Sequence, residues 1–154
     1  MQTQDIDYRA DADMRGYLAF DEAKAGPRPG VLVLHEGLGL GEFAMARARM
    51  LAELGYVAFA ADMFGERRQA RNPQEVAKLV GDLRNEPGTL RARGHAALAT
   101  LKAMPQVDAG RMAAIGFCFG GWWCWSSPAT APISRLRSVF TASSPPECRP
   151  YRTG

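Results

Sequence analysis

Long apolar runs are missing from this sequence, and cysteine is scarce. No stretch approaches the roughly 18 apolar residues that a membrane-spanning helix requires. The start, Met1 to Asp7, has neither the basic nor the apolar segment of a signal peptide. The three cysteines (Cys118, Cys124 and Cys148) form an odd, sparse set, unlike the disulfide framework of a secreted domain. These absences predict a cytoplasmic protein with free thiols and no membrane contact.

A strong excess of one charge is also missing. The chain has 19 Lys and Arg residues against 16 Asp and Glu residues, which gives a formal net charge of +3. The basic residues are scattered among acidic ones, so no dense patch indicates nucleic-acid binding. A length of 154 residues fits a single domain. We expect no nucleic-acid partner, and the sequence does not indicate an oligomeric state.

Apolar segments of two kinds alternate along the chain. Residues 14–20 alternate as a half-buried strand does, and a Gly and Pro cluster over 26–30 ends that segment. Short apolar runs predict buried strands at 31–34, 56–61 and 111–115, the last preceded by a turn over 108–110. Helical spacing predicts helices over 42–54, 73–83 and 89–104. Strands that alternate with helices indicate an α/β fold, with a mostly parallel sheet and helices on both faces.

The first of these helices has a predicted apolar side. Its larger apolar residues recur at helical spacing, and a glycine follows as a C-cap. The residues of this side are Phe43, Ala46, Met50, Leu51 and Leu54.

A candidate nucleophile follows the last strand. Residues 116–120, Gly-Phe-Cys-Phe-Gly, are a cysteine version of the G-x-S-x-G turn that presents the nucleophile of α/β-hydrolases. The flanking glycines relieve crowding where a strand turns sharply into a helix. The helix N-terminus favours the thiolate of Cys118, and the backbone N–H of Phe119 faces the carbonyl oxygen under attack. The alternative is that Cys118 is a small buried apolar residue.

A second candidate segment, His35-Glu36-Gly37, ends the strand over 31–34, and ligand sites lie at this end of parallel strands. In α/β-hydrolases the loop after this strand supplies the second oxyanion donor, here the N–H of Gly37. Glu36 is either a site residue or a solvated loop acid. His35 points to the opposite face of the strand, which favours a structural role.

Two other chemistries fit the sequence poorly. The glycines over 37–41 lack both the lysine of a P-loop and the spacing of a dinucleotide-binding turn. Cys118 and Cys124 are not spaced as C-x-x-C, and no further cysteine or histidine lies near them to form a redox pair or a metal site.

Taken together, four segments resemble the dienelactone hydrolase family in order and spacing: residues 31–36, 51–58, 62–65 and 115–121. The resemblance covers about residues 14–121. It implies an incomplete α/β-hydrolase that cleaves carboxylic esters or lactones without a cofactor or metal. It also implies that Cys118 is the nucleophile, that Glu36 interacts with the resting thiol, and that Arg67 receives a substrate carboxylate.

The family's catalytic triad also contains an aspartate and a histidine, which follow the nucleophile in α/β-hydrolases. Here both histidines, His35 and His95, precede Cys118, and Glu147 is the sole acid after it. His95 falls in a predicted surface helix and is a poor substitute. We therefore expect impaired turnover, because a thiol nucleophile needs a base within reach. The alternative is a non-catalytic fold remnant or interaction module.

The sequence changes character after Gly121, and residues 122–154 show no helical or strand period, so we expect an irregular tail after an N-terminal part over 1–121. Residues 122–125, Trp-Trp-Cys-Trp, must be encoded TGG TGG TGY TGG. In the reading frame that begins two bases later, the same bases give GTG GTG YTG, which encodes Val-Val-Leu. The codons of residues 139–142 likewise permit Phe-His-Gly. This indicates a frameshift near Gly121.

The frameshift makes a prediction about the gene. Sequencing the locus should reveal a longer open frame, in the displaced phase, beyond codon 121. If that phase is closed by stop codons, the tail is a genuine part of the protein and the frameshift hypothesis is wrong.

Overall fold

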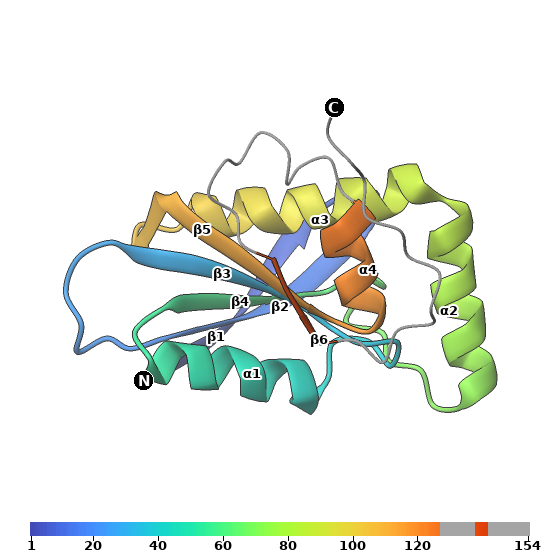
Figure 1. Ribbon diagram of the computed structural model, residues 1–154, viewed down its shortest axis with the longest axis horizontal. Helices are drawn as coiled ribbons and strands as arrows, with labels where there is room; N and C mark the ends of the chain where they lie inside the picture. The colour runs from blue at the N-terminus through green and yellow to red at the C-terminus, as the bar shows by residue number, and fades with distance from the viewer. Residues whose placement is uncertain (127–137, 142–154) are drawn as a thin grey trace.

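The computed structural model describes residues 1–126 and 138–141, with side chains described up to Trp122, as a mixed sheet packed between helices (Figure 1). The sheet has the strand order β1-β2-β4-β3-β5-β6. Strands β4, β3, β5 and β6 run parallel to one another, β2 pairs with β4 antiparallel, and β1 pairs with β2 antiparallel. The strands are β1 (Gln2–Arg9), β2 (Asp13–Phe20), β3 (Arg28–Leu34), β4 (Val57–Ala61), β5 (Val107–Phe117) and β6 (Ser138–Thr141). The helices are α1 (Glu42–Glu53), α2 (Pro73–Asn85), α3 (Pro87–Lys102) and α4 (Phe119–Ser126). The predicted fold class is confirmed.

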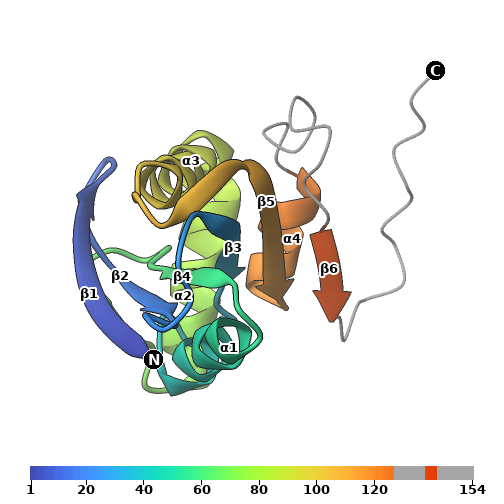
Figure 2. The same ribbon diagram turned by 90° about the vertical axis from the view of Figure 1, so that its left-hand side faces the viewer.

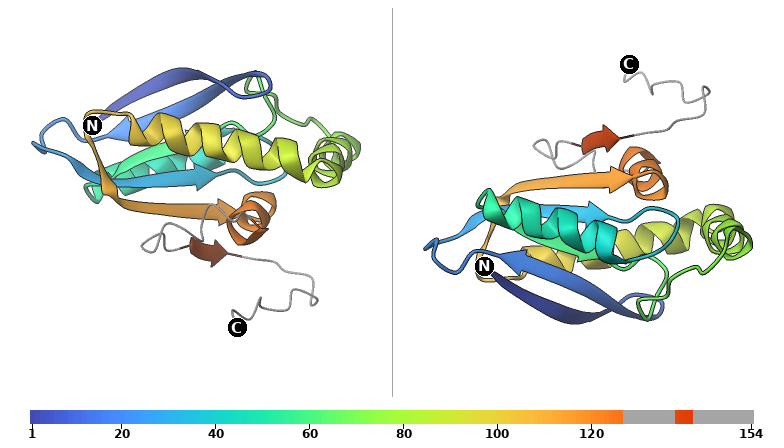
Figure 3. Two further views of the ribbon diagram at one scale, coloured as in Figure 1. Left: turned by 90° about the horizontal axis from the view of Figure 1, so that it is seen from above. Right: turned by 90° about the horizontal axis from the view of Figure 1, so that it is seen from below.

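Alternation along the parallel strands divides the core between the two faces of the sheet. On β3, Leu32 and Leu34 join the cluster beneath α2 and α3, whereas Val31 and Val33 join the cluster beneath α1. Figure 2 shows α1 on one side of the sheet and α2 and α3 on the other, with β1 and β6 at opposite edges, and Figure 3 shows the two faces in turn. Both faces of β3 and β4 are covered, as parallel strands require.

The predicted apolar side of α1 is wrong at three of its five positions. Phe43, Met50 and Leu54 are exposed, Leu51 is half-buried against the sheet, and the fully buried positions of the helix are others. The buried residues are three alanines spaced four apart: Ala44, Ala48 and Ala52. Alanine lets the helix axis approach the valines and alanines of β3 and β4 closely, so residue size outweighs hydrophobicity at this interface.

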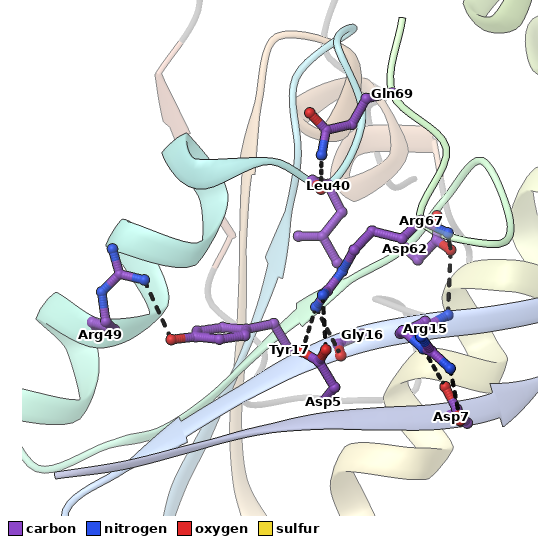
Figure 4. Close-up of polar contacts among 10 residues, drawn as sticks. All are labelled: Asp5, Asp7, Arg15, Gly16, Tyr17, Leu40, Arg49, Asp62, Arg67 and Gln69. Atoms are coloured by element: carbon purple, nitrogen blue, oxygen red, sulfur yellow. Dashed lines mark hydrogen bonds and ion pairs between the residues drawn. The ribbon is translucent and has the colours of Figure 1, made fainter.

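Strand β1 has no counterpart among the predicted elements, because its side chains are mostly polar and exposed. It pairs with β2 along its whole length, so its stability comes from the backbone ladder and a few anchors. The hydroxyl of Tyr8 donates to the carbonyl of Asp62 at 2.8 Å, and its ring packs edge-on against Phe59. Arg15 pairs with Asp7 across the two strands (Figure 4).

Two predicted turns lie at the starts of strands instead. β3 begins at Arg28, inside the Gly and Pro cluster, and β5 begins at Val107, before the turn predicted over 108–110. The ladder between them is irregular here: Pro29 pairs with Asp108, and Gly30 already pairs with Met112. Residues 109–111 therefore form a bulge in β5. Pro29 lies opposite this bulge, where its missing N–H is tolerated.

The expectation of an irregular tail is wrong for part of residues 122–154. Residues 122–126 complete α4, and 138–141 form β6, parallel to β5. The N–H of Trp122 donates to the carbonyl of Cys118 at 3.2 Å, and the guanidinium of Arg84 lies 5.5 Å from the Trp122 ring. Residues 127–137 and 142–154 lie outside the described part, and the boundary at Gly121 stays a prediction. No helix in the described ranges is long and apolar enough to span a membrane.

The alanine face of α1 can be tested by two substitutions of opposite expectation. Ala48→Leu inserts extra methylenes into a fully buried contact and should lower the free energy of unfolding by about 1–3 kcal/mol. Met50→Ala truncates an exposed side chain and should change it by less than about 0.5 kcal/mol. Urea unfolding of both variants measures the difference. The reverse ranking would mean that α1 packs through its larger residues.

Candidate active site

Cys118 occupies a strained turn between β5 and α4. Its φ of 50° lies in the left-handed region, which a residue with a side chain adopts at a cost of about 1–3 kcal/mol. The residue is exposed, and its thiol forms no disulfide with any side chain in the described part of the chain. The alternative of a buried apolar cysteine is therefore wrong. A strained, solvent-facing thiol at a strand end is the geometry of a nucleophile elbow.

The glycines on either side of Cys118 are required by close packing. A Cβ at Gly116 would lie 2.3 Å from the carbonyl carbon and oxygen of Gly120. A Cβ at Gly120 would lie 2.5 Å from the carbonyl oxygen of Leu34 and 2.7 Å from that of His35. Real Cβ contacts are never this short, so no other residue fits without moving backbone. This is the crowding that the sequence motif predicts.

The elbow touches the loop that follows β3. The N–H of Gly120 donates to the carbonyl of His35 at 3.1 Å, which joins the start of α4 to the end of β3. In that loop the N–H of Gly39 donates to the carbonyl of Glu36 at 3.2 Å. Glu36 is half-buried, and its Oε2 atom is buried without a hydrogen-bond partner in the described part of the chain. The structure thus brings the Cys118 and Glu36 segments together, although no hydrogen bond joins the two side chains among the described residues.

Two backbone N–H groups belong to the same pair of segments. Phe119 opens α4, and the first N–H groups of a helix have no acceptor within it. Gly37 follows Glu36 and packs beside α2, where an added Cβ would lie 3.0 Å from Val76. The loop after it is fixed at Leu38, whose carbonyl accepts from Ala70 N–H at 2.9 Å.

His35 is buried and neutral behind this loop. Its Nδ1 lies 2.6 Å from the carbonyl of Glu36, which can only accept, and its Nε2 lies 3.1 Å from the N–H of Met63, which can only donate. Nδ1 therefore carries the proton. Burial lowers the pKa of His35, because removing the ring from water penalises its charged form. Both ring nitrogens are used, as the predicted structural role requires. His95, by contrast, is exposed on α3.

Asp62 is a structural residue of the site that the sequence argument missed. Its carboxylate is buried at the end of β4 and accepts four backbone N–H groups at 2.7 to 3.3 Å. The donors are Arg15, Phe64, Gly65 and Arg67. An aspartate that ends a buried strand three residues before a glycine was the available signal, since such carboxylates commonly bind the backbone of the following turn.

The structure does not bring Arg67 to the thiol segment. Its guanidinium donates to both carboxylate oxygens of Asp5 at 2.7 and 2.9 Å and reaches the carbonyl of Gly16 at 3.4 Å (Figure 4). These contacts tie β1 and β2 to the turn that follows Asp62. The predicted role of Arg67 toward a substrate carboxylate stays a prediction, and it requires the pair with Asp5 to open.

The sequence left two alternatives to a thiol nucleophile at Cys118, a metal site and a redox pair. No group of three or more His, Cys, Asp or Glu side chains within the described residues is arranged to hold a metal ion. The side chain of Cys124 lies outside the described residues, so its pairing with Cys118 is untested.

Comparison with known proteins places these features in a family. The family model described as "Dienelactone hydrolase family" matches residues 14–140. A predicted carboxymethylenebutenolidase of Methylorubrum extorquens is 29% identical over 112 residues, which is 71% of this chain and 38% of that protein.

Solved structures agree with this match. A dienelactone hydrolase-like promiscuous phosphotriesterase from metagenomic libraries superposes with a TM-score of 0.82 at 38% identity, covering 90% of this chain and 58% of that one. A protein named m3DLH gives 0.76 at 43% identity, covering 78% and 50%. The chain spans about half the length of these proteins. Since the family match extends over most of its residues, the chain belongs to the dienelactone hydrolase family.

Proposed function

We propose that this chain carries the acylation half of a hydrolase that cleaves carboxylic esters or lactones, with Cys118 as its nucleophile. The observation that carries the proposal is the exposed, left-handed Cys118, which the close approach of Gly120 to β3 fixes at the start of a helix. The family consists of hydrolases, and a curated relative is named for a butenolide, which is a lactone. No cofactor is needed for this chemistry.

The acylation step uses groups of this chain alone. The sulfur attacks the substrate carbonyl carbon, and the N–H groups of Phe119 and Gly37 stabilise the negative oxygen that forms. The ester C–O bond then breaks, which leaves an acyl thioester on Cys118. Glu36, whose Oε2 has no protein partner among the described residues, turns to the thiol in this step, accepts the proton of Cys118, and then donates that proton to the leaving oxygen.

Hydrolysis of the thioester requires a further base to activate water. Neither histidine of this sequence suits that task, because His35 is buried with both nitrogens bonded and His95 lies exposed on α3. We therefore propose that these 154 residues form the acyl-enzyme and release it slowly. The cytoplasmic location and the small-molecule substrate inferred from the sequence remain part of this proposal.

A burst experiment tests the nucleophile. Mixed with p-nitrophenyl acetate, the chain should release about one equivalent of p-nitrophenolate quickly and then turn over slowly, because deacylation is the slow step. Mass spectrometry should locate the acetyl group on Cys118. Cys118→Ser should abolish the burst, whereas the double variant Cys124→Ser and Cys148→Ser should retain it. A folded wild-type chain without a burst would favour a non-catalytic module, and fast steady turnover would refute the proposed impairment.

The close approach behind Cys118 makes a second prediction. Gly120→Ala places a Cβ 2.5 Å from the Leu34 carbonyl oxygen, so the elbow must shift and the burst rate should fall at least about 10-fold. The matched control is Gly81→Ala in α2, where an added Cβ meets nothing within 4 Å. It should leave the burst unchanged and stabilise the protein by about 0.5–1 kcal/mol. Equal burst rates in the two variants would show that the elbow does not depend on Gly120.

A further inference from the structure

His35 lies where three loops meet, each at the carboxyl end of a parallel strand. Its own carbonyl accepts the N–H of Gly120 in the elbow after β5, at 3.1 Å. Its Nδ1 donates to the carbonyl of Glu36, in the loop after β3, at 2.6 Å. Its Nε2 accepts the N–H of Met63, in the turn after β4, at 3.1 Å. One buried side chain with its backbone thus connects all three segments.

The bond to Glu36 fixes more than a carbonyl. The carbonyl of Glu36 and the N–H of Gly37 belong to one planar trans peptide, in which they point in opposite directions. Whatever holds the oxygen therefore sets the direction of the N–H. Two donors hold it, the ring of His35 at 2.6 Å and the N–H of Gly39 at 3.2 Å, and the ring is the closer.

The ring itself has little freedom. It is fully buried and packs edge-on against Phe64, with ring centroids 4.8 Å apart, and beside Phe119 at 6.0 Å. The N–H of Met63 occupies Nε2, so the proton must stay on Nδ1, where Glu36 needs a donor. The Asp62 carboxylate fixes the turn that contains Met63, because it accepts the N–H groups of Phe64 and Gly65.

We propose that His35 is a positioning residue for acylation: it orients the Glu36–Gly37 peptide so that the Gly37 N–H faces the oxygen of a carbonyl attacked by Cys118. This inference rests on the proposed function and deepens it. His35 touches no reacting atom. Its effect reaches the substrate through one peptide plane, so it should matter for steps in which an oxyanion forms and for no others.

Two reactions of the same thiol separate positioning from a general structural role. Acylation by p-nitrophenyl acetate passes through an oxyanion, whereas alkylation by iodoacetamide is a displacement at carbon that forms none. His35→Phe keeps an aromatic ring and loses both hydrogen bonds. It should lower the acylation rate constant of Cys118 by about 10- to 100-fold. The alkylation rate constant should stay within about 2-fold of wild type, because the thiol and its helix are unchanged.

Two amide variants test which bond matters. In His35→Asn the side-chain amide nitrogen lies about as far from the backbone as Nδ1 of histidine, so it can still donate to the carbonyl of Glu36. In His35→Gln the side-chain amide oxygen lies about as far out as Nε2, so it can still accept from the N–H of Met63. We expect His35→Asn to lose the least acylation, and His35→Gln to behave like His35→Phe. His95→Asn, at the exposed histidine, is the matched control and should match wild type in both reactions. Circular dichroism and thermal unfolding establish that each variant is folded.

The outcomes distinguish the two proposals. If the wild type acylates and the His35 variants acylate equally fast, or lose acylation and alkylation in parallel, the positioning role is refuted and the nucleophile stands. If His35→Phe does not fold, the ranking of His35→Asn against His35→Gln decides, and an equal ranking refutes the role. If the wild-type thiol is alkylated but never acylated, the proposed function fails, and this inference fails with it.

Discussion

The site depends on one close contact, the approach of the α4 start to the end of β3. The N–H of Gly120 lies 3.1 Å from the carbonyl of His35, in a space that admits no Cβ. This contact sets where α4 begins, and the start of α4 sets where Cys118 must turn. The left-handed φ of Cys118, unfavourable by about 1–3 kcal/mol, persists because strand and helix on either side leave it no alternative. Strain at Cys118 is thus a consequence of packing between backbones.

A second layer of buried polar groups holds the loops around that contact. The Asp62 carboxylate collects four N–H groups of its own turn and of β2, and the neutral ring of His35 links that turn to the loop carrying Glu36. Every one of these bonds joins a side chain to backbone. Such bonds fix peptide planes directly, and an oxyanion site made of backbone N–H groups needs fixed peptide planes rather than fixed side chains.

The sequence predicts the central strands and the elbow well because they obey simple local rules. Residues 31–34 and 57–61 are continuous apolar runs, and Gly116 and Gly120 mark a crowded turn whatever surrounds it. Prediction fails where tertiary contacts outweigh composition. The buried face of α1 consists of alanines because the helix lies close to the sheet, and hydrophobicity alone favours its larger residues. Strand β1 is polar and owes its position to β2, a partner that its own pattern does not specify.

The same reasoning explains which site residues sequence could indicate. Cys118, Phe119, Glu36 and Gly37 follow strands in register with their neighbours, since Leu34 pairs with Gly116, and so their segments converge whatever the rest of the fold does. Arg67 lies six residues beyond the end of β4, and the direction of its side chain is set by Asp5 on β1, a strand that the sequence pattern does not reveal.

This division also separates the two halves of the proposed reaction. Acylation needs a thiol, a nearby carboxylate and two N–H groups, and all of these lie on β3, β5 and the residues that directly follow them. Water activation needs a base, and neither β3 nor β5 nor the residues that directly follow them position one. A chain that contains the β3–β5 core can therefore be competent for the first step independently of the second, because the two steps place their geometric demands on different parts of the fold.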